Sequence, residues 1–187
     1  MKINTKLNLV CPIETEDGEV HFHSKPIMRE TFEKYHIVIA RTFTSLLSQG
    51  LDITGAKVAA MHLKEMAIEM GVWEGVEGVE NGLLEEITRL TNVIVPTEQG
   101  WKTLPVSVAI SKGHIAEDDW WEAKQRIVFF ILISAMSKPK VTLSYLSGMC
   151  RIWQTVTTSL TDMEYLGSLP TSTETVILPT NTSLLPS

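Results

Sequence analysis

The chain has 187 residues, 44% of them hydrophobic and 20% charged, and its 16 Lys and Arg against 22 Asp and Glu give a formal net charge of −6. This length allows one ordinary domain with an appendage but not two catalytic domains. The apolar content excludes general disorder, and the negative charge argues against a protein that binds a nucleic-acid backbone through a basic patch.

Neither membrane insertion nor secretion is indicated. The longest unbroken apolar run, residues 127–133, is far shorter than the roughly 20 residues that a membrane-spanning helix needs. The first residues lack the apolar segment of a signal peptide, so we expect synthesis in the cytoplasm. Cys11 and Cys150 are too few and too far apart for a disulfide framework, and we expect both to be reduced and structural.

An N-terminal β-hairpin is predicted over about residues 3–23. Apolar and polar residues alternate from residue 7 to residue 13 and again from residue 20 to residue 22, as in strands with one buried face. Asp17 and Gly18 supply the turn, because Gly tolerates the positive φ of tight turns.

The first predicted helix spans about residues 28–49, where apolar residues recur at helical spacing before Gly50. Thr54 can cap a second helix, whose small and apolar stripe continues to Met70. Three glycines then indicate a loop over residues 73–82.

Apolar residues resume helical spacing in a short third helix at about residues 83–90. The pattern over residues 91–113 suits either short strands or buried helical turns, and helix is slightly favoured around Val106. The sequence therefore leaves the middle of the chain open.

A fourth, long helix is predicted from about Asp119 to Met136, because Asp119 and Glu122 resemble a capping box. Its middle is apolar on all sides, which is typical of a helix buried in its own fold or by a partner. Pro139 separates it from a fifth helix, whose apolar stripe continues as far as Leu160. Together these elements predict an α+β fold that is mainly helical.

The C-terminal residues 168–187 differ in composition from the helical domain, which we place at residues 1–167. They are rich in Ser, Thr and Pro and carry a single charge, on Glu174. Such a segment can hardly form a core, which favours a disordered tail. Its remaining apolar residues leave open the alternative of an arm that docks in extended form on a neighbouring chain.

Catalytic, metal-binding and phosphate-binding patterns are weak. His21 and His23 share one face of a predicted strand, but local spacing places no third metal ligand beside them. The glycines of residues 71–78 lack the Lys-Ser/Thr ending of a phosphate loop, and the acidic residues 117–119 are better explained as helix capping. We therefore expect no catalytic residue, no metal and no cofactor, and a binding protein rather than an enzyme.

Short motifs run through most of the chain in a fixed order. They are Pro12-Ile13, Asp17-Gly18, Pro26-Ile27, Glu117-Asp118-Asp119, Glu122-Ala123, Val128-Phe129-Phe130, Thr158-Ser159-Leu160, Glu164-Tyr165 and residues 168–173. In this order the motifs resemble tail assembly chaperones of long-tailed bacteriophages.

The resemblance implies a non-catalytic role in the host cytoplasm. Members of this family coat the tape measure protein, prevent its aggregation, help tail-tube subunits polymerise around it, and leave before the virion is complete. The implied partners are the tape measure protein and the tail-tube protein, with a homo-oligomer as a further option and with neither nucleic acid nor membrane. The alternative is a phage structural protein that stays in the head or tail, and an enzyme comes third.

Candidate partner-binding residues lie on the second and fourth predicted helices, where a small-residue stripe and an apolar segment could form a groove for an amphipathic helix. Adjacent residues point about 100° apart on a helix, so we expect one of Trp120 and Trp121 in the core and the other in contact with a partner. The full set is Ala56, Ala60, Leu63, Ala67, Met70, Trp120, Trp121, Phe129 and Phe130.

Overall fold

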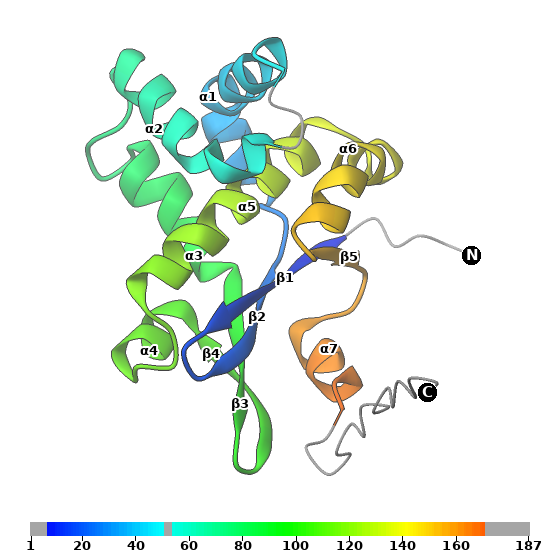
Figure 1. The fold of residues 1–187 in the computed structure, drawn as a ribbon. Helices are drawn as coiled ribbons and strands as arrows, with labels where there is room; N and C mark the ends of the chain where they lie inside the picture. The colour runs from blue at the N-terminus through cyan, green and yellow to red at the C-terminus, as the bar shows by residue number, and fades with distance from the viewer. Residues whose placement is uncertain (1–6, 51–53, 171–187) are drawn as a thin grey trace, which may run out of the picture.

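A five-stranded antiparallel sheet carries a layer of helices on one face and a short C-terminal helix on the other (Figure 1). The computed structural model describes residues 7–50 and 54–170. The fold is α+β and mainly helical, as the sequence predicts.

The predicted hairpin is confirmed. β1 (Asn8–Thr15) pairs in antiparallel register with β2 (Gly18–Ser24). Gly18 has a φ of 122°, a conformation that residues with a side chain rarely adopt, so the turn requires glycine here. Residues 3–6 of the predicted hairpin lie outside the described residues.

Three further strands extend the hairpin in the order β4-β3-β2-β1-β5. They are β3 (Thr91–Thr97), β4 (Gly100–Pro105) and β5 (Val156–Thr158). The open region of the sequence therefore contains two strands, followed by the helix favoured around Val106, α4 (Val106–Ser111).

The first predicted helix is confirmed as α1 (Arg29–Ser48). The second is divided into a 3-10 turn, η1 (Thr54–Lys57), and α2 (Ala59–Glu69). A π-helical turn, η2 (Val79–Leu84), leads into α3 (Glu85–Arg89), so the helical conformation begins inside the predicted loop.

Tyr35 of α1 explains where η2 forms. Its hydroxyl donates a hydrogen bond to the Glu77 carbonyl oxygen at 3.1 Å, which ties the loop to α1. A side-chain carbon at Gly82 would overlap that hydroxyl, so close packing here needs glycine.

The fourth predicted helix is confirmed as α5 (Glu117–Met136), but its cap differs from the prediction. Ala116 is the residue before the helix, and its amide donates to the Asp119 carboxylate at 2.7 Å. Asp119 therefore stabilises the first turn from inside the helix, as the acidic member of a capping box does.

The predicted extent of the fifth helix is wrong. α6 (Pro139–Ile152) ends eight residues before Leu160, Gln154 reverses the chain with a φ of 53°, and β5 follows. The reason is long-range, because Val156 pairs with Val10 on the outer edge of β1. Backbone hydrogen bonds of a sheet replace those that a longer helix would make.

α7 (Asp162–Ser168) was not predicted as a helix, and its last residue falls at the predicted domain boundary. Thr161 caps it, since the Glu164 amide donates to the Thr161 hydroxyl at 3.3 Å and the Glu164 carboxylate accepts from the Thr161 amide at 2.8 Å. Most of the predicted arm, residues 171–187, lies outside the described residues.

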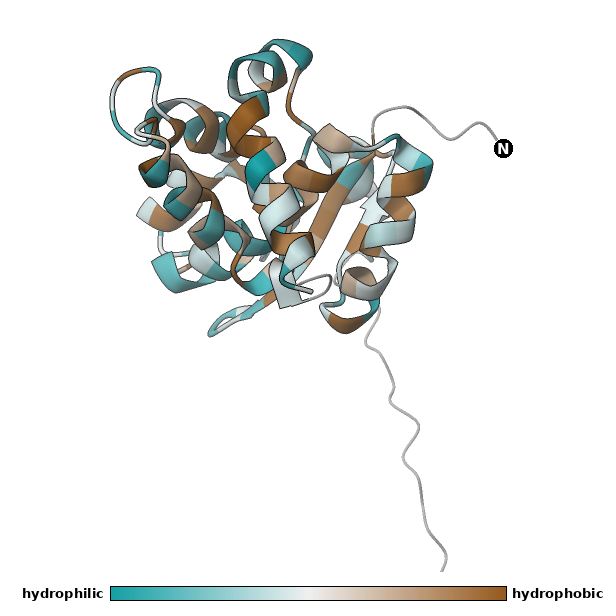
Figure 2. Ribbon diagram, turned by 90° about the horizontal axis from the view of Figure 1, so that it is seen from above, coloured by the Kyte–Doolittle hydropathy of each residue, from teal (hydrophilic) through white to brown (hydrophobic). Residues whose placement is uncertain are grey.

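The core lies between the helices and one face of the sheet. Residues 127–133 of α5 are all buried, and α5 packs against α1, α2, η1 and β1, with brown apolar ribbon gathered inside the fold in Figure 2. Cys11, Phe22, Val93 and Leu104 form one row across this face. Within the described ranges, no helix is long and apolar enough to cross a membrane.

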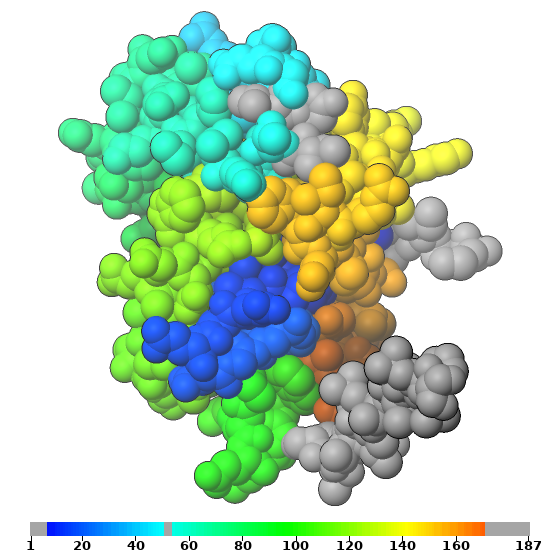
Figure 3. Space-filling view, viewed as in Figure 1, coloured from blue at the N-terminus to red at the C-terminus, as the bar shows by residue number. Residues whose placement is uncertain are grey.

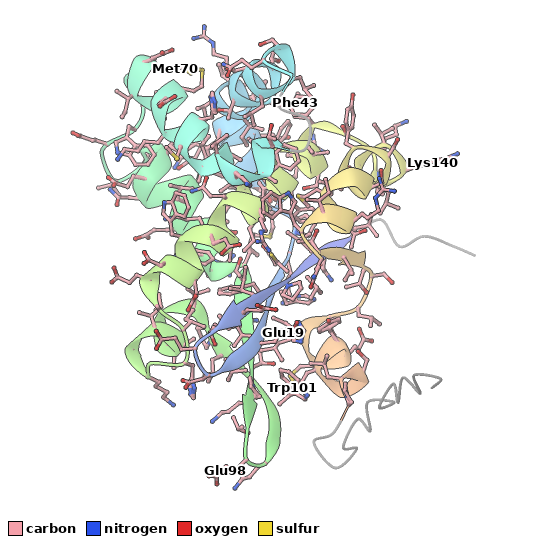
Figure 4. The ribbon with its side chains drawn as sticks, in the orientation of Figure 1. Glu19, Phe43, Met70, Glu98, Trp101 and Lys140 are labelled. Carbon is pink, nitrogen blue, oxygen red and sulfur yellow. The ribbon has the colours of Figure 1, made fainter. Side chains whose placement is uncertain are left out.

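The opposite face of the sheet, which we call the α7 face, is largely polar and aromatic. His21 lies with its ring centroid 5.2 Å from that of Trp101 on β4 and 5.8 Å from that of Tyr165 on α7. The His23 Nε2 donates to the Leu160 carbonyl oxygen at 3.1 Å. Figure 4 shows Trp101 beside α7, where these contacts are made.

Candidate partner-binding groove

Six of the nine predicted partner-binding residues are buried in the chain's own core. The small residues of η1 and α2 let these elements pack closely against α5, whose two phenylalanines are buried in the core. These side chains are therefore not exposed to a partner in this conformation. They are Ala56, Ala60, Leu63, Ala67, Phe129 and Phe130.

The other three predicted residues lie nearer the surface. Trp120 packs against the core and stacks on Phe22, with ring centroids 5.9 Å apart and planes at 22°. Trp121, the next residue, is 49% exposed. Met70 is half-buried against the core at the end of α2 (Figure 4). Trp121 is thus the member of the tryptophan pair that faces outward.

A groove of about 690 Å³ runs between α2, α5 and the η2–α3 segment. We call it the α2–α5 groove. In Figure 3 the cyan-to-teal surface of α2 adjoins the yellow-green surface of α5. Its apolar, aromatic and basic side chains include Met61, Lys64, Ile68, Trp73, Trp120, Trp121 and Lys124, and its acidic ones are Glu65, Glu80 and Glu85.

The α2 wall follows from helical spacing. Met61, Lys64 and Ile68 are three and four residues apart, so they share one face of the helix. Met61 is 46% exposed and Ile68 is 54% exposed, which is unusual for two large apolar side chains beside an exposed tryptophan. The wall therefore offers apolar surface that the described chain leaves uncovered.

The floor of the groove holds its two walls together. The Gln125 side-chain oxygen, buried on α5, accepts a hydrogen bond from the Ala60 amide at 2.9 Å. Amides in the first turn of a helix have no partner within the helix, so this contact satisfies one and fixes α2 against α5. The groove is preformed rather than dependent on a partner for its shape.

Two lysines and three glutamates give the groove charges of both signs. The Lys64 ammonium lies 5.2 Å from the ring centroid of Trp73, and the Lys124 ammonium lies 6.0 Å from that of Trp120. Burial and, secondly, the nearby Lys64 charge lower the pKa of Lys124. Such cation–π contacts keep the apolar stems of both lysines along the tryptophan rings.

A second hollow of about 570 Å³ adjoins the first, and Trp121 lines both. Arg126 lies at its base, buried, and donates to the carbonyl oxygens of Pro12 at 3.3 Å and Trp153 at 3.4 Å. This arginine joins the open edge of β1 to α5 and to the end of α6. It fixes the helix that presents Trp121.

The remaining candidate groups for chemistry lie elsewhere. Cys11 and Cys150 are free, and burial raises the pKa of the Cys11 thiol to about 11. His21 and His23 do lie on one face of the sheet, as predicted. Both rings lie near Tyr165 of α7, on the α7 face and away from the groove. Across residues 7–50 and 54–170, no group of three or more His, Cys, Asp or Glu side chains could hold a metal ion.

The predicted partner-binding residues lie on the two helices that flank the groove, but most of those on the second predicted helix face the core. A stripe of small residues marks the side on which a helix packs closely, which here is the inward side. The groove is lined instead by the adjacent stripe of larger residues, Met61 and Ile68, with Lys64 between them. Trp73, in the glycine-rich loop, had no helical pattern to place it.

Comparison with protein-family models, with curated proteins and with solved structures finds no match to this chain.

Proposed function

We propose that the chain is a tail assembly chaperone of a long-tailed bacteriophage, and that it holds a helical segment of the tape measure protein in the α2–α5 groove. It would act without catalysis in the host cytoplasm and assist polymerisation of the tail-tube protein. The observation that supports the proposal is the exposure of Trp121, Met61 and Ile68 along one preformed groove.

Helix-in-groove recognition requires such a surface. An amphipathic helix places its apolar residues at helical spacing into a hydrophobic groove, and large aromatic side chains supply most of the binding free energy. A tape measure protein is a long helical partner, so many weakly bound copies of the chaperone would coat it. Weak contacts repeated along one partner gain strength through multivalency.

The test is co-expression with the candidate tape measure protein, followed by affinity capture. We expect Ile68→Ser to reduce capture about five- to thirtyfold, because it removes an apolar anchor worth about 1–2 kcal/mol. Ile37→Ser is the matched control, since Ile37 is 53% exposed on α1 and does not line the groove. This control should capture the partner as the unaltered chain does.

Failure of the unaltered chain to capture the tape measure protein would contradict the proposal. Mass spectrometry of purified virions tests the alternative of a structural protein that stays in the particle. We expect the chain to be absent or present only in traces there. Abundant copies would instead favour the structural protein.

A further inference from the structure

Lys64 and Lys124 are the two cations that line the α2–α5 groove, beside Glu65, Glu80 and Glu85, in a protein of net charge −6. Neither takes part in an ion pair within 4.0 Å among the described residues, although six such pairs occur elsewhere on the molecule. Both side chains line the α2–α5 groove from opposite walls, Lys64 on α2 and Lys124 on α5.

This arrangement costs free energy in the isolated chain. Lys124 is half-buried against Trp120, and its ammonium loses part of its hydration while it faces a like charge on Lys64. A like charge and burial both disfavour the charged form of a lysine. An anion placed between the two ammonium groups would favour their charged forms and so offset both effects.

We propose that the α2–α5 groove selects a partner helix that carries a single carboxylate flanked by apolar side chains, and that this carboxylate lies between the Lys64 and Lys124 ammonium groups. The inference rests on the proposed function, since it assumes that the groove binds a helix. Met61, Ile68 and Trp121 contact the apolar residues on either side of the carboxylate.

The glutamates that line the groove limit the partner helix to a single carboxylate. Glu65, Glu80 and Glu85 also line it, and none lies within 4.0 Å of either lysine nitrogen. A polyanion such as a nucleic acid would therefore place phosphates against three glutamates. A helix with one Glu or Asp between apolar residues meets the lysines and avoids that repulsion.

The experiment uses two synthetic helical peptides of about 20 residues, long enough to hold a helix, with the same leucine stripe. They differ only in one central residue, Glu in one and Gln in the other, and each carries a fluorophore for anisotropy measurements on the full chain. We expect the Glu peptide to bind about five- to tenfold more tightly at low salt, because two partly desolvated lysines pair with its carboxylate.

The variant Lys64→Gln/Lys124→Gln should bind the two peptides equally, whereas Lys112→Gln/Lys140→Gln should keep the preference. Lys112 and Lys140 are exposed lysines outside the groove, so this control removes the same charge. Circular dichroism would check that all variants are folded.

Equal binding of the two peptides to the unaltered chain, or binding of neither, would overturn the inference. A preference that survives in Lys64→Gln/Lys124→Gln would overturn it as well. The proposed function can fail independently of this inference. In that case the chain prefers the Glu peptide but does not capture the tape measure protein.

Discussion

The two faces of the sheet are covered in different ways. On the helical face, Phe22 and its row of apolar neighbours are buried under long helices. On the α7 face, His23, the next residue of the same strand, lies under a seven-residue helix with no buried residue of its own. A short helix can thus cover a sheet when hydrogen bonds and aromatic contacts replace apolar packing.

Specific polar contacts hold α7 in place. The Asn92 side-chain amide donates a hydrogen bond to the Asp162 carboxylate at 2.7 Å, and the Lys25 ammonium lies 3.6 Å from the same carboxylate. The Asn8 side chain donates to the Leu160 carbonyl oxygen just before the helix. The strength of such contacts depends on hydrogen-bond geometry and on protonation. The stability of the helical face depends instead on how well apolar side chains fill the space between sheet and helices.

The largest expected effect comes from a change that breaks the helical face. Phe22→Ala should lower the free energy of unfolding by about 3–5 kcal/mol, because it opens a cavity at the centre of the sheet and removes the ring that supports Trp120. Urea denaturation followed by far-UV circular dichroism measures it. Loss of support for Trp120 should also weaken partner capture.

Glu16→Ala, in the exposed β1–β2 turn, is the control on the same hairpin and should change stability by no more than about 0.5 kcal/mol. A cost for Phe22→Ala similar to that of the control would mean that the helical face is not the main source of stability.

The difference between the faces also explains which parts of the fold the sequence predicts. Alternation along β1, helical spacing along α1, and the acidic start and apolar middle of α5 are local patterns, and these elements were predicted correctly. β5 was missed because Val156 continues the apolar stripe of α6, and only its pairing with Val10 on a distant strand makes it extended. α7 was missed although the Thr161–Glu164 capping box is a local sequence signal for the start of a helix.

The candidate site was predictable to a similar degree. Adjacent tryptophans on one helix must diverge, so the sequence predicts one exposed indole, and the structure identifies it as Trp121. The α2 wall was not predicted, because a helical pattern does not tell which of two neighbouring stripes faces the core. That choice depends on how α2 packs on α5, fixed here by Gln125.

Acidification should weaken the α7 face selectively. Burial lowers the pKa of both His21 and His23. The Glu19 charge raises the pKa of His21, and the Leu160 carbonyl and Asp162 raise that of His23, but the effect of burial is larger in both cases. The unfolded chain therefore binds more protons than the folded chain below the ordinary pKa of 6.5, and the free energy of unfolding falls as pH falls below that value.

The pKa values of Asp162 and Tyr165, which also lie at this face, are shifted away from the histidine range. Despite burial, the Lys25 charge and the Asn92 hydrogen bond lower the pKa of Asp162 below 3.8, and burial and Glu19 raise the pKa of Tyr165 above 10.0. Loss of stability between pH 6.5 and 5 would therefore report on the two histidines.

Thermal unfolding of the unaltered chain measures this effect. We suggest pH values of about 7.5, 6 and 5, which span the range in which histidine titrates. His21→Gln/His23→Gln should reduce the pH dependence, because neither position then titrates, and the exposed His36→Gln should leave it unchanged. Equal stability of the unaltered chain at all three pH values would refute the prediction, and with it the account of the α7 face as sensitive to protonation.

The smallest expected effect comes from deletion of residues 168–187. The deletion keeps Asp162 and Tyr165, the residues that hold α7 on the sheet, and removes the hydrogen bond from Trp101 Nε1 to the Pro170 carbonyl oxygen, 3.1 Å long and exposed. Such a bond contributes about 1 kcal/mol or less, so the Tm should fall by no more than about 3 °C. A larger fall, measured by calorimetry, would mean that residues after Gly167 stabilise the α7 face, and the domain would then extend beyond the boundary predicted from composition.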